Sequence, residues 1–259
     1  MISVEELKVL PFGSHPASYN MALDSRLLDI CERDPRSGFL RLYQWAPPAL
    51  SLGFFEPADT VDRDRAAARG IDVVRRPTGG RVVLHKGDLT YSVAVSRQAG
   101  PGAAVYARIS ECIAAGLRSL GAGVEIARGA RPGLAATARP CFLSASRHEI
   151  VYRGRKVVGS AQRLGRSALL QHGSIPLDAG YLEVVDYMKC SEEERAGMKR
   201  GLIAAGVCVG EILGARIEPA AVAEALVEAF RAGFGPRLTR VSPDYRFALD
   251  RGGSVGLTP

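Results

Sequence analysis

Short β-rich runs, broken by glycine and proline and grouped between helical segments, constrain the fold of this chain more than any other feature. Helical patterns cover residues 17–33, 60–69 and 105–120 and resume beyond residue 181. Strand patterns cover 39–45, 50–55, 71–75, 82–85, 89–96, 124–127, 149–152, 156–164 and 168–177. Because strands are grouped and do not alternate singly with helices, the order predicts the α+β class. We expect a single domain with a central mixed, mainly antiparallel β-sheet flanked by helices.

Length and composition restrict the class of protein further. The chain has 259 residues, 47% of them hydrophobic, which suffices for one large core and excludes disorder as the main state. It has no apolar run of about eighteen residues, the length that a membrane-spanning helix needs. Glu5, Glu6 and Lys8 stand where a secretory signal needs apolar side chains. We therefore expect a cytoplasmic protein without a membrane partner.

Cysteine spacing and net charge bear on metals and partners. The five cysteines are scattered, without a C-x-x-C pair, and no H-E-x-x-H occurs, so neither a disulfide framework nor a metal site is predicted. The formal net charge of +7 favours an acidic partner, although a basic surface without such a partner remains open. Aromatic residues do not interleave with the basic ones as a nucleic-acid stacking platform requires, so no nucleic-acid partner is expected.

Residues 75–85 form the first segment that can carry chemistry. Here Arg75, Arg76 and Thr78 precede Gly79 and Gly80, and the segment ends at His85. Glycines between strands let the backbone approach a ligand closely, and guanidinium groups bind anions or carbonyl oxygens. The segment is neither a Walker loop nor a dinucleotide fingerprint. A surface hairpin with solvated arginines is the alternative that the residues alone leave open.

Residues 154–162 form the second segment. Lys156 lies early in a strand and is followed by three small residues, Gly159, Ser160 and Ala161. Small side chains on a strand leave a groove for an elongated ligand. A lysine beside that groove can stabilise negative charge that develops on a carbonyl oxygen. An exposed hairpin lysine is the alternative.

Cys141 is the candidate nucleophile among the cysteines. It follows a loop, next to Arg139 and Pro140, and a hairpin can bring Lys156 within reach of its sulfur. A neighbouring cation lowers the pKa of a thiol, although a lone cysteine is also commonly a small buried hydrophobe. The other four cysteines lie in helical or apolar contexts and are predicted to be structural.

The histidines are the remaining candidates for acid–base chemistry. His172 stands at the centre of the last predicted strand, where it either lines the site or is a structural histidine. His148, next to Glu149, is interpreted as part of a pair on a strand surface. The sequence has no nucleophile elbow of the G-x-S-x-G type.

Four motifs in sequence order resemble the lipoate/biotin protein ligase superfamily of cofactor transferases. The resemblance covers residues 18–172 and extends more loosely to about 247. Its motifs are the opening-helix segment Asn20–Asp24, the W-x-P-P-x-x-S-L-G-like segment Trp45–Gly53, the R-R-x-T-G-G-like segment Arg75–His85, and the K-x-x-G-S-A element Lys156–Ala161.

Details within these motifs resemble the cysteine-dependent octanoyltransferase branch of that superfamily. Arg81 stands where lipoate–protein ligases carry a third glycine, and Cys141 is followed by Phe142. The segments G-R-K-x-x-G-S-A-Q and Q-H-G-S follow in the same order. One departure is Glu56, at a position where relatives often have glutamine.

The resemblance implies one ligase-like catalytic domain over residues 1–259, with its core at about 36–247. It implies transfer of an octanoyl group from acyl carrier protein to a lysine of a lipoyl domain, such as glycine cleavage H protein, in endogenous lipoate synthesis, without a cofactor. Cys141 would form the acyl thioester and Lys156 would assist it. The substrate would contact Arg75, Arg76, Thr78, Gly79, Gly80, His85, Gly159, Ser160, Ala161 and His172. The alternatives are an ATP-dependent lipoate–protein ligase, an octanoyl amidotransferase between lipoyl domains and a silent binding module.

Overall fold

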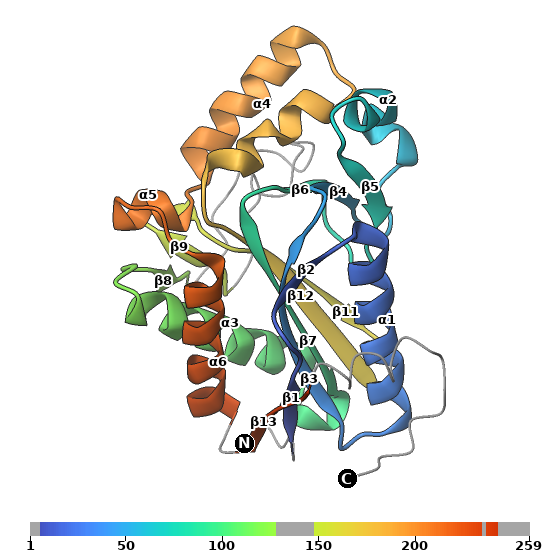
Figure 1. The fold of residues 1–259 in the computed structure, drawn as a ribbon, viewed down its shortest axis with the longest axis vertical. Coiled ribbons are helices and arrows are strands. Elements are labelled where there is room, and N and C mark those ends of the chain that lie inside the picture. Colours follow the sequence, from blue (N-terminus) through green and yellow to red (C-terminus); the bar gives the residue numbers. More distant parts are fainter. Residues whose placement is uncertain (1–5, 128–147, 235–236, 243–259) are drawn as a thin grey trace.

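A seven-stranded mixed sheet forms the centre of the protein (Figure 1). The computed structural model describes residues 6–127, 148–234 and 237–242. The strand order is β11-β12-β7-β3-β1-β13, and β2 also pairs with β3. These strands are β1 (Leu7–Val9), β2 (Gly13–His15), β3 (Gly38–Trp45), β7 (Asp88–Ser96), β11 (Gly159–Leu164), β12 (Ala168–Pro176) and β13 (Leu238–Arg240).

The longest strands of this sheet are antiparallel, and two of them are fully buried. Strands β3, β7, β12 and β11 pair antiparallel in turn, whereas β1 pairs parallel with β3 and with β13. All nine residues of β7 and of β12 are buried, because helices cover both faces of the sheet. The predicted α+β class with a central mixed sheet is therefore confirmed.

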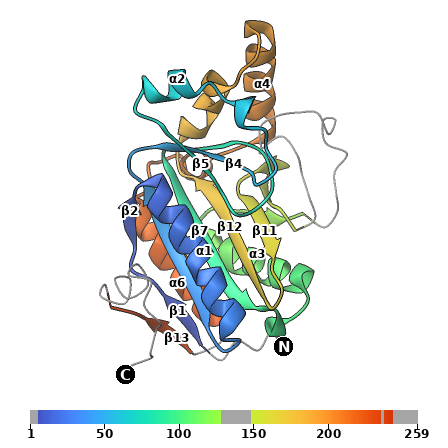
Figure 2. The same cartoon turned by 90° about the vertical axis from the view of Figure 1, so that its right-hand side faces the viewer.

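Helices pack on both faces of the central sheet, as Figure 2 shows for α1 (Ala17–Arg33) and α3 (Gly102–Ser119). Helix α1 contributes Leu23, Leu27 and Cys31 to the core on its side. On the other face α3 packs against α6 (Pro219–Phe234) over the side chains of β7. Apolar residues at helical spacing produce these buried faces.

Two further three-stranded sheets and several additional helical elements surround the central sheet. One small sheet has the order β5-β4-β6, with β4 (Ala49–Leu52), β5 (Asp72–Arg75) and β6 (Val83–His85); the other has the order β10-β9-β8, with β8 (Glu125–Ile126), β9 (Ile150–Tyr152) and β10 (Arg155–Lys156). The remaining helical elements are η1 (Ala58–Thr60), α2 (Arg63–Ala67), η2 (Arg97–Ala99), the 3₁₀ segment η4 (Ala179–Tyr187), α4 (Glu192–Ala205) and α5 (Val209–Leu213).

The predicted elements agree with the structure except at particular positions. The expected strand over 156–164 is wrong, because the chain leaves one sheet after Lys156 and enters the central sheet at Gly159. The strand expected over 50–55 ends at Leu52, and the helix expected over 60–69 is confined to Arg63–Ala67. The short strands β1, β2 and β13 were not predicted, because three residues are too few to show a periodicity.

Within the described residues, no helix combines the length and the apolar character that crossing a lipid bilayer requires.

Candidate active site

A pocket opens between the central sheet and the β4–β6 region, and its empty space is about 350 Å³ including the open mouth. Its lining comes from α1, the β4–β6 region and four strands of the central sheet (β3, β7, β11 and β12), and consists of Met21, Tyr43, Trp45, Ser51, Arg76, His85, Thr90, Gly159, Ser160, Ala161, His172, Gly173 and Ser174.

His85 forms the first buried polar centre of this pocket. Its Nδ1 lies 2.8 Å from Asp88 Oδ2, and its Nε2 lies 2.9 Å from Ser51 Oγ. The ring stacks on Trp45, with 4.0 Å between the ring centroids. Asp88 also accepts hydrogen bonds from the hydroxyls of Thr90, at 3.2 Å, and Ser174, at 2.7 Å. A carboxylate acceptor at Nδ1 places the ring proton there, so Nε2 accepts from Ser51.

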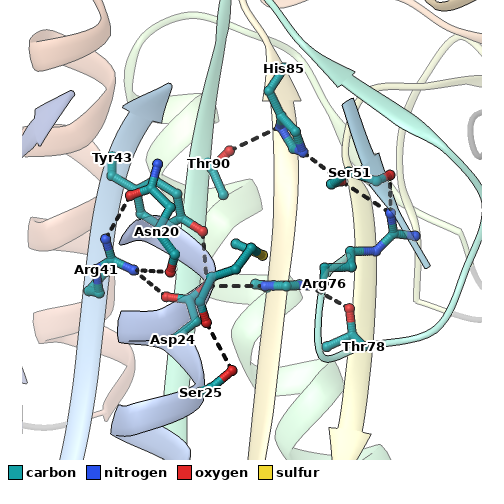
Figure 3. Close-up of polar contacts among 12 residues, drawn as sticks. Asn20, Asp24, Ser25, Arg41, Tyr43, Ser51, Arg76, Thr78, His85 and Thr90 are labelled. Carbon is teal, nitrogen blue, oxygen red and sulfur yellow. Dashed lines mark hydrogen bonds and ion pairs between the residues drawn. The ribbon is translucent and has the colours of Figure 1, made fainter. Parts of the chain in front are cut away.

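His172 forms the second centre, and its partners come from more distant parts of the chain. Its Nδ1 lies 3.1 Å from Asp24 Oδ2 on α1, and its Nε2 lies 2.5 Å from Thr78 Oγ1. Asp24 forms an ion pair with Arg41 and accepts a hydrogen bond of 2.9 Å from Tyr43 (Figure 3). These contacts connect α1, the central sheet and the glycine-containing loop of residues 77–81.

The charges of this second centre follow from its burial. Burial alone would raise the pKa of Asp24, but Arg41 and the hydrogen bonds from His172 and Tyr43 outweigh it and lower that pKa. Burial, together with the nearby Arg76, lowers the pKa of His172 and outweighs the adjacent Asp24, which raises it. Asp24 is therefore ionised and His172 neutral near pH 7, which leaves His172 Nε2 as an acceptor for the Thr78 hydroxyl.

Arg75 and Arg76 donate hydrogen bonds to main-chain carbonyls of the segments that follow β4 and β5. Arg76 donates to the main-chain carbonyls of Ser51 at 2.8 Å, Gly79 at 2.9 Å and Arg81 at 2.7 Å. Arg75 Nη1 donates to three main-chain carbonyls in the segment after β4, those of Gly53, Phe54 and Glu56, at 2.7 to 2.9 Å. The guanidinium groups are thus engaged with backbone oxygens, and their contact with a substrate stays a prediction.

One glycine of this region is required by close backbone approach. A Cβ on Gly53 would lie 1.8 Å from the carbonyl oxygen of Gly80, so a larger residue would push the loop away. Gly80 itself has φ +94°, whereas a Cβ on Gly79 would meet nothing within 4 Å. Arg81 stands at the position where lipoate–protein ligases carry a third glycine. Its guanidinium Nη1 lies 3.8 Å from the carboxylate of the buried Glu56, the residue that replaces the glutamine common in relatives, so the two side chains form an ion pair.

Lys156 is buried and forms an ion pair that the sequence interpretation missed. Its Nζ lies 2.7 Å from Glu149 Oε1, and the two residues are only 6% and 5% exposed. The interpretation of Glu149 as part of a strand-surface pair with His148 is therefore wrong, because Glu149 points into the protein. The alternative of an exposed hairpin lysine is also wrong. The signal was available: a two-residue turn at Arg153-Gly154 sets Lys156 opposite Val151, and Glu149 lies two residues along on the same face.

Cys141 lies outside the described residues, so its contact with Lys156 stays a prediction. The four described cysteines are Cys31, Cys112, Cys190 and Cys208. Burial raises the pKa of Cys31 to about 12 and that of Cys112 to about 11, and it also raises the pKa values of Cys190 and Cys208. Raised thiol pKa values disfavour thiolates, which agrees with structural roles for these four.

The structure brings together six of the residues expected to bind substrate: Arg76, His85, Gly159, Ser160, Ala161 and His172 line the pocket. Thr78 contacts this group through His172, while Arg75, Gly79 and Gly80 are not among the lining residues. The sequence interpretation assigned no role to Asp24 or Asp88. For Asp24 a signal existed, because Asn20 and Asp24 share the helix face that carries the apolar residues and therefore have to be buried.

Solved structures with the same architecture define the class of fold. A lipoate-protein ligase A bound with ATP superposes with a TM-score of 0.72 at 21% identity, covering 95% of this chain and 93% of its own. A bi-partite lipoate protein ligase from Thermoplasma acidophilum gives the same TM-score and identity, with 95% and 91% covered. The fold is that of the lipoate–protein ligases, as expected.

Sequence relatives define the family. Residues 16–231 match the model of the lipoyl protein ligase A/B catalytic domain. Octanoyltransferase LipM of Kyrpidia tusciae is 39% identical over 89% of this chain and 88% of its own, and that of Staphylococcus aureus is 33% identical over 87% and 86%. The chain belongs to the lipoyl protein ligase A/B catalytic domain family. The expectation of an acyltransferase is confirmed at the level of class.

Proposed function

We propose that this protein moves an octanoyl group from the thioester of an acyl carrier protein to a lysine of a lipoyl domain, through a thioester on Cys141. The relatives named octanoyltransferase LipM support the reaction. The observation that carries the proposal is the pocket, whose walls include both the Gly159–Ala161 segment and residues held by the loop of residues 77–81.

The polar side chains of the pocket are suited to an apolar ligand because they bond to one another. Trp45 Nε1 donates to Thr90 at 2.8 Å, and Tyr91 donates to Ser160 at 2.7 Å. His85 and His172 each have both ring nitrogens bonded. An acyl chain that enters therefore leaves few polar atoms unpaired, and burial of the six methylenes of an octanoyl group contributes about 5 kcal/mol.

The chemistry divides into two half-reactions. The Cys141 thiolate attacks the thioester carbonyl carbon, a carbon–sulfur bond forms, and the carrier thiol leaves with a proton. The amine of the acceptor lysine then attacks the new thioester, an amide forms, and the Cys141 thiolate is released as the amine loses its proton. Lys156, as an ammonium, stabilises the thiolate and the oxyanion that develops on the carbonyl in each half-reaction.

The net charge of +7 suits both proteins in the proposed reaction, because carrier proteins and lipoyl domains are commonly acidic. Complementary charge raises the rate of encounter more than it raises affinity. We expect the rate of transfer to fall as salt is added.

The test is intact mass measurement after incubation with octanoyl–acyl carrier protein and no ATP. We expect an octanoyl adduct that hydroxylamine removes and that Cys141→Ala abolishes. Cys190→Ala is the matched control, since Cys190 is partly exposed and has a raised pKa, and it should keep the adduct. Lys156→Met should slow acylation by about 100-fold or more.

Each alternative has its own outcome. Modification of a lipoyl domain that needs free octanoate and ATP and survives Cys141→Ala would identify a ligase. Transfer that occurs only between lipoyl domains would identify an amidotransferase. Carrier-protein binding without any transfer would identify a binding module.

A further inference from the structure

A turn after β4 carries two exposed phenylalanine side chains. Phe54 is 45% exposed and Phe55 is 87% exposed, the highest fraction among the large apolar side chains of the described residues. Their rings meet edge to face, with 4.9 Å between the centroids. Glu56 N donates to the Gly53 carbonyl at 3.0 Å, which closes the turn around the two phenylalanines. The rings are therefore presented to solvent by a hydrogen-bonded turn.

This turn is joined to two segments that contribute to the pocket. Phe54 N donates to the Thr78 carbonyl at 2.8 Å, and the Thr78 hydroxyl bonds to the pocket residue His172. The guanidinium of the exposed Arg163 lies over the Phe54 ring, 5.6 Å from its centroid. Arg163 is two residues beyond the pocket residue Ala161 in β11 and shares its face of the sheet. The aromatic patch, as we call this exposed surface next to the pocket, consists of Phe54, Phe55 and Arg163.

Arginines dominate the charge around the aromatic patch. Besides Arg163, Arg75 donates to main-chain carbonyls of the turn, and Arg81 forms an ion pair with the buried Glu56. Asp59 in η1 is the next acidic residue along the chain. Single exposed apolar side chains need no explanation, but adjacent aromatic rings beside arginines are typical of the residues that dominate protein interfaces. The patch therefore fits a partner surface with carboxylates around an apolar centre.

We infer that the aromatic patch docks the acceptor lipoyl domain, through an acidic surface around the lysine that is modified. The inference rests on the proposed function and adds to it the surface that receives the acceptor. A lysine side chain is a four-carbon stem, so its amine reaches the pocket only if the acceptor domain itself contacts the surface next to the pocket. A donor that carries its thioester on a longer prosthetic arm needs no contact so close. The net charge of +7 favours the encounter with an acidic domain.

The experiment measures the Kd of unmodified glycine cleavage H protein, labelled with ¹⁵N and titrated with this protein by NMR. We expect Phe55→Ser to raise the Kd at least about tenfold and Arg163→Glu to raise it at least about fivefold. Leu164→Ser is the matched apolar control, because Leu164 is 54% exposed and lies on the opposite face of β11. Arg216→Glu is the charge control, with a side chain that is 90% exposed. Each control should change the Kd by less than about twofold.

The same Kd in Phe55→Ser and in the unsubstituted protein, or no binding of H protein at all, would overturn the inference. A variant that loses affinity for acyl carrier protein but keeps it for H protein would also overturn it, because the patch would then serve the donor.

A small octanoyl thioester separates docking from chemistry, because it brings no protein surface. Phe55→Ser should form the Cys141 adduct with this thioester at the unsubstituted rate, while transfer from the adduct to H protein slows. A slower adduct formation in the variant would assign Phe55 to the pocket and overturn the docking role. Absence of the adduct in the unsubstituted protein would contradict the proposed function, whereas the Kd of H protein would still decide whether the patch is its docking surface.

Discussion

The two buried histidines of the pocket have the same pattern of hydrogen bonds, but their carboxylate partners come from different distances along the chain and have different partners of their own. Each ring has a carboxylate at Nδ1 and a hydroxyl at Nε2. The carboxylate of His85 is Asp88, three residues away, which accepts from hydroxyls. The carboxylate of His172 is Asp24, 148 residues away, which pairs with a buried guanidinium. The comparison shows that one histidine has a carboxylate partner close in the sequence, whereas the other is joined to a distant helix whose carboxylate also forms an ion pair.

The largest difference is expected when each carboxylate is made neutral. Asp24→Asn leaves Arg41, which is 3% exposed, without its ionic partner, and should reduce the free energy of unfolding by about 3–5 kcal/mol. Asp88→Asn removes an acceptor of neutral donors and should cost about 1–3 kcal/mol. Urea unfolding at pH 7 measures both. Equal costs would show that the ion pair does not distinguish the two centres.

A second difference between the two histidines concerns pH, because the stability that the neutral His172 contributes should depend on pH. The folded protein lowers the pKa of His172, so the unfolded chain takes up a proton first as pH falls below about 6.5. The stability from the neutral ring is fully present above that pH and decreases as the pH falls toward the folded pKa. For this one proton, the slope of the decrease cannot exceed about 1.4 kcal/mol per pH unit.

The control for this pH effect is His172→Gln. Urea midpoints measured from pH 7.5 to 5 should fall less steeply in this variant than in the unsubstituted protein. Asp24, whose pKa is lowered, loses its contribution only at more acidic pH, below this window. A slope unchanged by His172→Gln would assign the pH dependence to other groups.

The smallest expected effects come from the two hydroxyls. Thr78→Val and Ser51→Ala each remove one hydrogen bond to a histidine, and each should cost about 1 kcal/mol. The two variants should differ in which backbone amides exchange faster with solvent. Phe54 N donates to the Thr78 carbonyl, so Thr78→Val should raise amide exchange there about fivefold, whereas Arg76 still holds the Ser51 carbonyl in Ser51→Ala. Amide exchange that rises equally in both variants would contradict a special role of His172 in holding the loop.

The same contrast explains how much of the site was predictable. His85 and its carboxylate partner Asp88 are only three residues apart, and the hairpin that aligns Lys156 with Glu149 has a turn that is visible in the sequence. The partnership of His172 with Asp24 and Thr78 was not predictable from spacing, because α1, β12 and the loop of residues 77–81 meet only when the sheet is assembled. The division of residues 156–164 between two sheets was missed for the same reason.

The sequence by itself determined the α+β class, the order of the main elements and the short motifs that resemble lipoate and biotin ligases, because periodicity and turn chemistry are local properties. Only the tertiary structure decided that Asp24 is ionised beside a neutral His172. It also decided that Arg75 and Arg76 donate hydrogen bonds to backbone carbonyls, and that Lys156 is buried against Glu149. These charges and partners depend on how deeply each side chain is buried and on which distant residues approach it. A local sequence pattern predicts neither the burial nor the approach.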